Sequence, residues 1–380
     1  MENTRQHAKP IRRGMYIEES QMNDEQRQII DAKGDLSCIV QGCAGSGKSC
    51  LALLKTIRLE KTVPRPSYYF VTFFQLLSRV LAGEMESAGH RGCQVMTMKE
   101  WSRNHCDADY ILVDECQDLS PEDIQNLNAS KRKSIFLYGD DSQQIMDFIR
   151  NRQPVALNWI KANLGLPVFR LRKNYRLPKQ VAYFAEEISG RKDLHDHCEN
   201  TGGHRPYVIR VSRDVKEQAD LIAETVKNGH FQNVGVLCRS NEDVKTLYNA
   251  MKDRGVTVSA KWWIEKRDNE CAPADPFGFG GGSRSRRRDR FDTSELSDTT
   301  IQIMTCHQAK GLQFEAVFLM SWPDLKDELE VNCYYVAITR TYHSLFVLYT
   351  DRLPEIVDAI PKQYYQTTLT DQPAGPAIQI

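Results

Sequence analysis

The chain has 380 residues, enough for two domains of ordinary size, and its 41% hydrophobic and 26% charged residues are typical of a globular protein. Basic and acidic residues number 50 each, so a net charge of zero neither supports nor excludes nucleic-acid binding. No apolar run approaches the ~18–20 residues that cross a bilayer, which argues against a membrane partner.

The N-terminal stretch and the cysteines indicate a cytoplasmic protein. Residues 1–20 are polar, contain no apolar secretory segment and are expected to form a flexible lead. The eleven cysteines are dispersed along the chain, which is typical of reduced thiols in the cytoplasm and not of a disulfide framework.

The residues Asn23-Asp24-Glu25-Gln26 form a capping-box pattern, which predicts a helix that runs to about Ala32. Two interpretations of Gln26 remain open. It caps the helix alone, or its amide also reads the edge of an adenine, since an amide both donates and accepts. The position of Gln26 shortly before a phosphate-binding loop favours the second interpretation.

The segment that follows fits the pattern G-x-x-x-x-G-K-[ST] at every fixed position. Leu36–Val40 is expected to be a buried strand, and Leu51–Leu59 an amphipathic helix, so strand, loop and helix follow in the order that a phosphate-binding loop requires. Lys48 would reach the β- and γ-phosphates of a nucleotide, and the Ser49 hydroxyl would ligate Mg²⁺. The predicted nucleotide-binding residues of the loop are Gly42, Cys43, Ala44, Gly45, Ser46, Gly47, Lys48 and Ser49.

An acidic pair follows the buried strand Tyr110–Val113. Ligands of open α/β sheets bind at the carboxyl ends of parallel strands, which is where this pair is expected to lie. Asp114 would hold Mg²⁺, directly or through water, and Glu115 would act as general base on the attacking water. Earlier strands are predicted at Tyr68–Thr72 and Val95–Thr97.

The strand Ser134–Tyr138 leads to Gln143, whose amide would orient the water or sense the γ-phosphate. Phe148 either stacks on a nucleic-acid base or belongs to the core, and the sequence favours neither. Residues 151–165 resemble a crossover, so we expect the first domain to span residues 21–165.

A second domain is predicted for residues 166–355, starting with the strand Val168–Leu171. Strands and helices alternate from Tyr207 to Ser259, which indicates another parallel sheet. At about residues 265–297 a Gly/Arg-rich linker interrupts the pattern, with five arginines between Arg284 and Arg290. The linker either contacts a phosphate backbone or is a solvated insert.

Two further expectations concern the second half of the chain. Strands return at Thr300–Met304, Ala316–Met320 and Leu345–Tyr349, and residues 356–380 are expected to form a C-terminal tail that frays from Tyr364 on. The residues His195, His197, Cys198 and His204 match no zinc-binding spacing, so no metal is expected among them.

The ordered set of motifs resembles the UvrD/Rep-type DNA helicases of superfamily 1. The matching strings are NDEQ at 23–26, GCAGSGKS at 42–49, VTF at 71–73, Thr97 with Trp101, VDECQD at 113–118, GDDSQQI at 139–145, NYR at 174–176, TCHQAKGLQF at 305–314 and YVAITR at 335–340.

The resemblance implies two RecA-like P-loop NTPase domains of the α/β class, each a parallel sheet flanked by helices. It implies that ATP and Mg²⁺ bind between them, with Tyr175 stacked on adenine and Gln313 at the sugar. Arg176 and Arg340 would be arginine fingers, so the predicted catalytic residues are Lys48, Glu115, Gln143, Arg176 and Arg340. It further implies movement on single-stranded or 3′-tailed DNA with 3′→5′ polarity. The implied DNA contacts are Thr72, Phe73, Thr97, Trp101, Phe148, Thr305 and His307.

The chain departs from the family pattern in several places. Lys99 replaces a usual histidine, Gln313 replaces a usual glutamate, and one stacking aromatic is missing near Phe148. The insertion after the second strand is cut to about a dozen residues, Gly83–Gln94, and the Gly/Arg-rich linker replaces the other. The resemblance is therefore to a compact member without the large inserted subdomains.

Three functions are consistent with these motifs. The chain is an ATP-dependent DNA helicase that translocates and unwinds, or an ATPase motor or switch subunit that needs a partner such as a nuclease, in DNA repair or anti-phage defence. The third is a nucleotide-binding scaffold without turnover. The catalytic residues Lys48, Glu115, Arg176 and Arg340 favour the first two.

Overall fold

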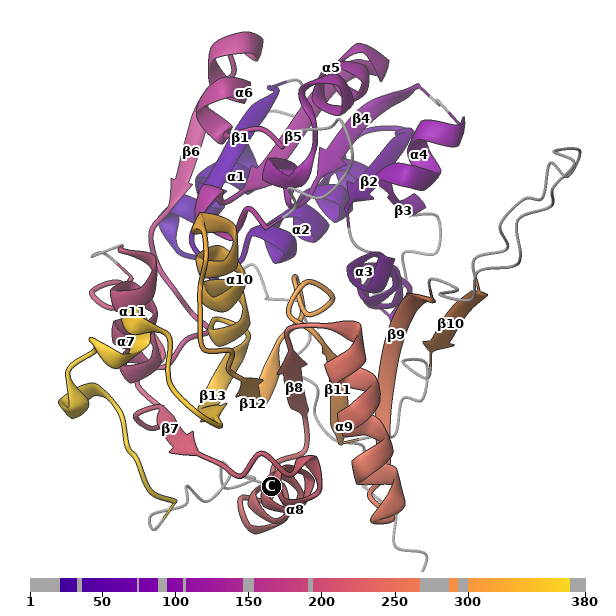
Figure 1. The fold of residues 1–380 in the computed structure, drawn as a ribbon. Helices are drawn as coiled ribbons and strands as arrows, with labels where there is room; N and C mark the ends of the chain where they lie inside the picture. The colour runs from indigo at the N-terminus through magenta and orange to yellow at the C-terminus, as the bar shows by residue number, and fades with distance from the viewer. Residues whose placement is uncertain are drawn as a thin grey trace, which may run out of the picture.

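The computed structural model describes nine segments of the chain (Figure 1): residues 21–32, 36–73, 75–87, 94–104, 107–145, 154–190, 194–266, 287–292 and 300–369. The predicted flexible lead, the interpretations of Phe148 and most of the predicted linker lie outside these residues. In the described residues no helix is long and apolar enough to cross a membrane, and no disulfide joins the cysteines.

The first half of the chain forms a parallel sheet with the strand order β3-β2-β4-β5-β1-β6. Its strands are apolar at consecutive positions because helices cover both faces, so neither face needs polar residues. The strands are β1 (Cys38–Gly42), β2 (Tyr68–Thr72), β3 (Gln94–Thr97), β4 (Ala108–Val113), β5 (Lys131–Gly139) and β6 (Val168–Leu171).

Side chains that alternate along each strand point to two separate cores. Along β4, Tyr110 and Leu112 pack with one set of helices, and Ile111 and Val113 pack with the other. The first set is α1 (Asp24–Asp31), α2 (Lys48–Thr62) and α3 (Gln75–Ser87); the second is α4 (Met98–Asn104), α5 (Pro121–Ser130) and α6 (Leu157–Leu164). The result is a three-layer αβα domain.

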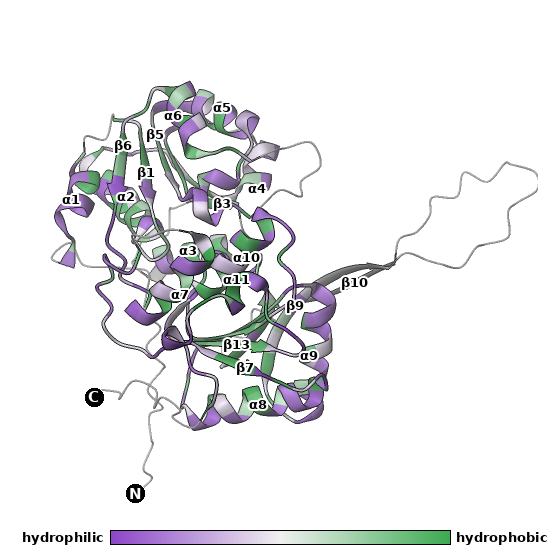
Figure 2. Cartoon of the chain, turned by 60° about the vertical axis from the view of Figure 1, so that its left-hand side comes forward, coloured by the Kyte–Doolittle hydropathy of each residue, from purple (hydrophilic) through white to green (hydrophobic). Residues whose placement is uncertain are grey.

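The second half repeats this architecture around a seven-stranded sheet of order β10-β9-β11-β8-β12-β13-β7. All its pairings are parallel except that of β9 with β10. Figure 2 shows hydrophobic residues concentrated in the strands and hydrophilic ones on the outer helices. The strands are β7 (Tyr207–Arg210), β8 (Val234–Cys238), β9 (Val258–Lys266), β10 (Arg287–Asp292), β11 (Ile301–Thr305), β12 (Phe314–Met320) and β13 (Thr341–Tyr349). The helices are α7 (Lys179–Ser189), α8 (Val215–Asn228), α9 (Asn241–Asp253), α10 (Glu328–Ile338) and α11 (Glu355–Asp358). Two parallel α/β sheets flanked by helices agree with the expected pair of RecA-like domains.

Two predicted boundaries around residue 165 are wrong. Residues 157–164 are the helix α6, and not part of a crossover between domains. The strand β6 was assigned to the second domain, but it pairs with β1 and completes the first sheet. Ladder pairing with β1 fixes its place, and the sequence of an isolated four-residue strand carries no such information. We propose that the chain crosses between the domains after Leu171.

The predicted linker and tail also contain more structure than expected. The linker was expected to begin at about residue 265, yet β9 runs to Lys266 and β10 pairs with it in antiparallel fashion. The tail was expected to fray from Tyr364 on, but Tyr365 is buried, as are Val357 and Ile360 before it. Gln366 continues the packing, since its N–H donates to Pro206 O (2.8 Å) and its C=O accepts from Val208 N (2.7 Å).

The helices α3 and α10 lie where the two domains meet (Figure 1), and apolar contacts join the domains there. Ile145, after the first sheet, packs with Cys333 and Val336 of α10. Gly311 lies so close to α3 that an added Cβ would be 2.7 Å from Leu77 Cδ2, and its φ of +82° is one that only glycine adopts readily. The domains therefore meet through small and apolar residues next to the ends of the strands.

A buried lysine fixes α1 on α2. The Lys55 side chain is 1% exposed, and its Nζ donates to the C=O groups of Ile29 (3.2 Å), Ile30 (3.1 Å) and Ala32 (2.6 Å). The last carbonyls of a helix have no intrahelical partner, and the ammonium supplies one. Because α1 carries Asn23 at its N-cap and Gln26 in its first turn, Lys55 also fixes where these two residues lie.

We expect Lys55→Met to destabilise the first domain by about 1–3 kcal/mol, because buried carbonyl groups lose their donor. Lys61→Met is the matched control, since Lys61 is exposed in the last turn of the same helix and its loss should change stability by less than about 0.5 kcal/mol. Urea unfolding followed by circular dichroism measures both. Equal effects of the two substitutions would contradict the capping role.

Candidate active site at the domain junction

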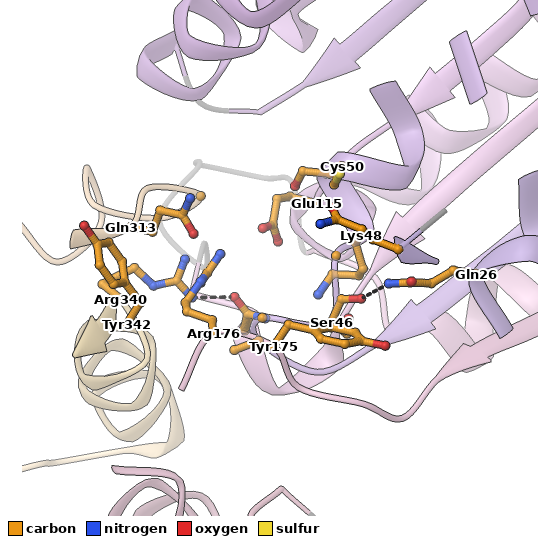
Figure 3. A pocket seen from close by; sticks show the side chains of 17 residues that line it. Gln26, Ser46, Lys48, Cys50, Glu115, Tyr175, Arg176, Gln313, Arg340 and Tyr342 are labelled. Carbon is orange, nitrogen blue, oxygen red and sulfur yellow. Dashed lines mark hydrogen bonds between the residues drawn. The ribbon is translucent and has the colours of Figure 1, made fainter. Parts of the chain in front are cut away.

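A cavity of about 590 Å³ lies between the two domains and contains most of the predicted ATP-site residues (Figure 3). Its walls come from the carboxyl-end loops of the first sheet and from three segments near the second sheet. The lining includes Gln26, Ala44, Gly45, Ser46, Gly47, Lys48, Ser49, Glu115, Gln143, Tyr175, Arg176, Gln313 and Arg340. Gln21, Cys50, Gly311 and Tyr342 also line it, and the sequence assigned them no role.

The phosphate-binding loop has the backbone that its glycines allow. Gly45 (φ +77°) and Gly47 (φ +90°) adopt left-handed conformations, and Gly47 is the N-cap of α2. An added Cβ on Gly45 would lie 2.6 Å from Arg176 Cβ. The loop thus brings the N-terminus of α2 to the cavity, which favours an anionic ligand. Lys48 Nζ donates to the C=O groups of Gly42 (2.9 Å) and Cys43 (3.0 Å).

Ser49 and Asp114 supply adjacent oxygen ligands. Ser49 Oγ donates to Asp114 Oδ2 at 2.5 Å, and the Asp114 side chain is fully buried. Burial and the neighbouring Glu115 carboxylate raise the pKa of Asp114 above its usual range. A hydroxyl and a buried carboxylate at the mouth of a phosphate-binding loop are the oxygen donors that Mg²⁺ prefers, so these residues fit the predicted metal site.

Glu115 has a strained backbone and a carboxylate held by hydrogen bonds and charge. Its φ of 56° is unusual for a residue other than glycine, and such strain clusters at functional sites. Gln117 Nε2 donates to Glu115 Oε2 at 2.6 Å. Burial alone would raise the pKa of Glu115, but the charges of Lys310 and Lys48 outweigh burial and hold it below its usual range. The carboxylate is therefore ionised at neutral pH.

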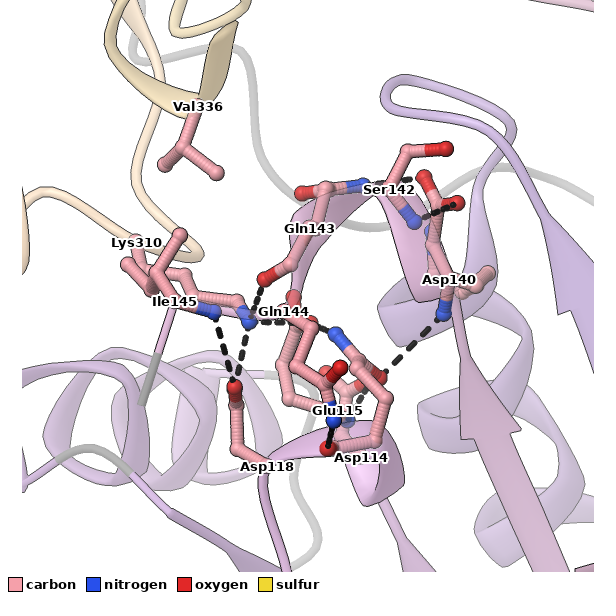
Figure 4. A network of polar contacts seen from close by, with 12 residues as sticks. Asp114, Glu115, Asp118, Asp140, Ser142, Gln143, Gln144, Ile145, Lys310 and Val336 are labelled. Carbon is pink, nitrogen blue, oxygen red and sulfur yellow. Dashed lines mark hydrogen bonds and ion pairs between the residues drawn. The ribbon is translucent and has the colours of Figure 1, made fainter. Parts of the chain in front are cut away.

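Lys310 carries a positive charge from the second domain into the first (Figure 4). Its side chain is fully buried, forms an ion pair with Asp118, donates to Gln143 O and lies 3.4 Å from Glu115 Oε2. Burial alone would lower the pKa of Lys310, but the two carboxylates raise it above its usual range. A buried charge needs such partners, so this contact ties the two domains at Glu115 and Asp118.

The two predicted arginine fingers lie together on the side of the cavity opposite Lys48 (Figure 3). Arg340 is 1% exposed and donates from Nε to Val336 O (2.9 Å) and from Nη2 to Gln143 Oε1 (2.9 Å). Arg176 Nη1 donates to Thr339 O at 3.3 Å, and its Nε has no hydrogen-bond partner among the described residues. Burial lowers the pKa of Arg340, and burial together with Arg340 lowers the pKa of Arg176 to about 9. Both guanidinium groups stay charged near neutral pH.

Gln143 joins the acidic and the basic halves of the site. Its Nε2 donates to Asp140 Oδ2 (2.8 Å), its Oε1 accepts from Arg340, and its side chain is 2% exposed. The amide uses its donor toward one domain and its acceptor toward the other. This geometry is consistent with a residue that responds both to the phosphate site and to the position of the second domain.

At the other end of the cavity, both interpretations of Gln26 are compatible with the structure. The predicted capping box is present, since Asn23 Oδ1 accepts from Gln26 N (2.8 Å) and Gln26 Oε1 accepts from Asn23 N (3.1 Å). The same side chain lines the cavity, and its Nε2 lies 3.5 Å from Ser46 O. Tyr175 closes this end, because its hydroxyl accepts from Asn23 Nδ2 (2.7 Å) and its N–H donates to Gly45 O (3.0 Å).

Several residues predicted to contact DNA are buried in the structure. Trp101 is 1% exposed and Thr72 fully buried. Trp101 packs in the apolar core of the first domain and exposes almost none of its surface, and its contact with DNA stays a prediction. The burial of Trp101 arises from tertiary packing in this core, which the neighbouring sequence does not show.

Thr97 and Thr305 have matching capping roles in the two domains. Thr97 Oγ1 and N donate to Glu100 Oε2 (2.9 and 2.7 Å), and Thr305 N donates to Gln308 Oε1 (2.9 Å) while its Oγ1 accepts from Gln308 N (3.3 Å). Each threonine ends a strand, and Thr97 precedes the helix α4 whereas Thr305 precedes a turn. His307 is half-buried, lies 3.4 Å from Cys333 Sγ through its Nε2, and its pKa is lowered by burial and by Lys310. Phe73 is half-buried.

The expectation of no metal near His195 stays a prediction. His195 Nε2 lies 3.0 Å from Asp196 Oδ1, and its Nδ1 pairs with Glu186. Among the residues that the structure describes, no group of three or more metal-ligating side chains is present.

The fold is that of two RecA-like P-loop NTPase domains, and Arg176 and Arg340 line the cavity between them. A family model of the viral superfamily 1 RNA helicase core domain matches residues 38–247, more than half of the chain, and a model of the UvrD-like helicase C-terminal domain matches residues 287–352. The chain belongs to the UvrD-like helicases of superfamily 1.

Relatives with curated names are similar to part of the chain. A protein of Mycoplasma pneumoniae named as a DNA helicase is 26% identical over 63% of this chain and 43% of its own length. One of Bacillus subtilis, named as an ATP-dependent DNA helicase, is 25% identical over 40% of this chain and 21% of its own. One of Acanthamoeba polyphaga mimivirus with the same description is 22% identical over 63% and 34%. The chain spans less than half the length of these relatives.

We expect Lys310→Met to cost about 3–5 kcal/mol of stability, because removing one partner leaves buried carboxylates without compensation. The matched control is Arg352→Met, which breaks the exposed pair with Asp324 and should cost less than about 1 kcal/mol. Combining Lys310→Met with Asp118→Leu should recover part of the loss. Denaturant unfolding measures the free energy of unfolding of each variant. Similar losses of stability in Lys310→Met and Arg352→Met would contradict the role of the buried pair.

Proposed function

We propose that the chain is an ATP-driven DNA motor of the UvrD/Rep type, which hydrolyses ATP between its two domains and moves 3′→5′ along single-stranded DNA. The observation that carries the proposal is the split site. Lys48, Ser49 and Glu115 face the cavity from the first domain, and Arg176 and Arg340 face it from the other side. The names of the relatives support DNA as the track.

Hydrolysis in this site depends on positioned charge. The loop N–H groups and Lys48 would bind the phosphates of ATP, and the ionised Glu115 would orient the attacking water and accept its proton. Ser49 and Asp114 would hold Mg²⁺, which when bound neutralises charge on the β- and γ-phosphates. Arg176 and Arg340 would stabilise the charge that develops on the transferred phosphoryl group.

Placing the arginines and the phosphate loop in different domains makes turnover depend on how the domains sit together. Gln143 bonds Arg340 and Asp140 at once, so a change at the γ-phosphate would reach the second domain. Closing and reopening the junction would move two DNA-binding surfaces relative to each other. Movement along the strand would rest mainly on phosphate contacts, which are independent of sequence and weakened by salt.

A second candidate function is an ATPase motor or switch subunit that separates strands only with a partner, such as a nuclease in DNA repair or anti-phage defence. The compactness of the chain favours it, because about a dozen residues stand in place of the first insertion and no large subdomain is present in the described residues. We further propose a cytoplasmic location.

We expect Arg340→Ala and Arg176→Ala each to lower kcat for ATP by ~10³ or more, since an arginine finger contributes ~10³–10⁵ in rate. Glu115→Gln should likewise abolish turnover, and Lys48→Ala should do so while also weakening nucleotide binding. Steady-state phosphate release with single-stranded DNA measures kcat, with the exposed Arg352→Ala as control. Wild-type turnover in Glu115→Gln would rule out the proposed mechanism.

Strand displacement on tailed duplexes separates the two candidate functions. A motor that unwinds alone should displace the strand from a 3′-tailed duplex with ATP and leave a 5′-tailed duplex intact. A subunit that depends on a partner should show DNA-stimulated ATP turnover with neither duplex displaced. Displacement from the 5′-tailed duplex alone would contradict the proposed polarity.

A further inference from the structure

Arg176 faces the cavity from a loop, and two asparagine side chains hold its backbone. The residue lies between β6 and α7, where no ladder of backbone hydrogen bonds fixes it. Its N–H donates to Asn174 Oδ1 (2.9 Å), and its C=O accepts from Asn200 Nδ2 (2.6 Å). Backbone groups outside regular structure need such partners, so these two side chains determine the course of the loop.

Asn200 also reaches the segment that carries the second arginine. The same Nδ2 donates to Tyr342 O (3.0 Å), two residues beyond Arg340. Asn200 Oδ1 accepts from Gly202 N (3.0 Å), which fixes the amide with its nitrogen toward the two carbonyls. One NH₂ group therefore bridges the two segments that supply Arg176 and Arg340. A hydrogen bond from Arg176 Nη1 to Thr339 O also joins these two segments directly.

The segment around Asn200 is itself wedged between these two parts of the chain. Gly203 has a φ of +84°, and an added Cβ would lie 2.5 Å from Pro178 Cγ and 2.7 Å from His343 O. Pro178 follows the Arg176 loop and His343 follows Arg340. Gly203 therefore has no room for a side chain between these two parts of the chain.

The turn before Asn200 is tied to the same loop. Asn174 N donates to His197 O (2.8 Å), and Glu199 N donates to Asn174 O (2.8 Å). The buried Glu186 carboxylate holds this turn by accepting from His195 N (2.9 Å). The cluster of histidines and a cysteine at residues 195–198 thus has a supporting role beside the Arg176 loop.

We propose that Asn200 is a positioning residue of the split ATP site, which holds the Arg176 and Arg340 segments at a fixed separation through one shared amide. The proposal rests on the proposed function, in which both arginines act on the transferred phosphoryl group. A misplacement of about 1 Å in a charged constellation can cost ~10²-fold in rate. Asn200 touches neither guanidinium group in these contacts, so it acts through backbone position.

Asn200→Asp tests this with little change of shape. It keeps the acceptor for Gly202 N and replaces the shared donor with an oxygen that faces two carbonyls. Asn163→Asp is the matched control, because Asn163 Nδ2 also donates to one carbonyl, Trp159 O (2.9 Å), on the exposed end of α6. Asn200→Ala, which removes the donor without adding charge, should show an intermediate effect.

Asn200→Asp should lower kcat for DNA-stimulated ATP turnover about 10-fold or more and leave the KM for ATP within about threefold. Asn163→Asp should behave as wild type. In an Arg176→Ala background, Asn200→Asp should lower kcat by a smaller factor than it does in the wild type, because one of the two arginines that it positions is gone. Wild-type kcat in Asn200→Asp, or full additivity with Arg176→Ala, would overturn the proposal.

Amide hydrogen exchange gives a readout that does not need turnover. Asn200→Asp should speed exchange at Arg176 and Leu177, whose N–H groups bond to Asn174 Oδ1, and leave exchange in the first sheet unchanged. Unchanged exchange at these two amides would overturn the proposal, as would equally faster exchange throughout the protein. If the wild type lacks ATP turnover, the proposed function fails, and the exchange result still decides whether Asn200 holds the loop.

Discussion

The buried ammonium of Lys310 is the contact on which the rest of the site depends. It belongs to the second domain and lies among Asp118, Glu115 and Gln143 O of the first. Bringing charges out of water is costly unless they are paired, so the domains reach this arrangement only when the pairing is complete. Its charge in turn keeps Glu115 ionised, which links the chemistry of the first domain to the position of the second.

The sheet topology explains why the other site residues converge. All strands of the first sheet are parallel, so the phosphate loop after β1, the acidic pair after β4 and Gln143 after β5 emerge at one edge. The second domain presents Lys310, Gln313 and Arg340 from loops after β11 and α10. Lys55 and Asn200 then fix the less regular parts, one beneath α1 and the other beside Arg176.

The local hydrophobic pattern was sufficient to predict strands and the candidate site residues in the loops that follow them. The strand Tyr68–Thr72 has the bounds expected from its apolar run, and the Asn23–Gln26 capping box is confirmed. Features that depend on distant partners were missed. Lys310 and Asp118, which form an ion pair, are 192 positions apart in the sequence. The strand β6 belongs to the first sheet because it pairs with β1. No sequence motif predicts the helix α7. The burial of Trp101 was also missed, because it arises from tertiary packing and not from the neighbouring sequence.

The central claim is that residues of both domains contact the same ATP molecule. Nucleotide binding must therefore change or restrict the distance between the two domains. The most direct measurement is a distance distribution by electron paramagnetic resonance between labels at Asn163 of α6 and Lys252 of α9, introduced as unnatural amino acids. The account predicts that a non-hydrolysable ATP analogue shifts the distribution to shorter distances or narrows it, and that ADP does so less. An identical distribution with and without bound analogue would contradict it.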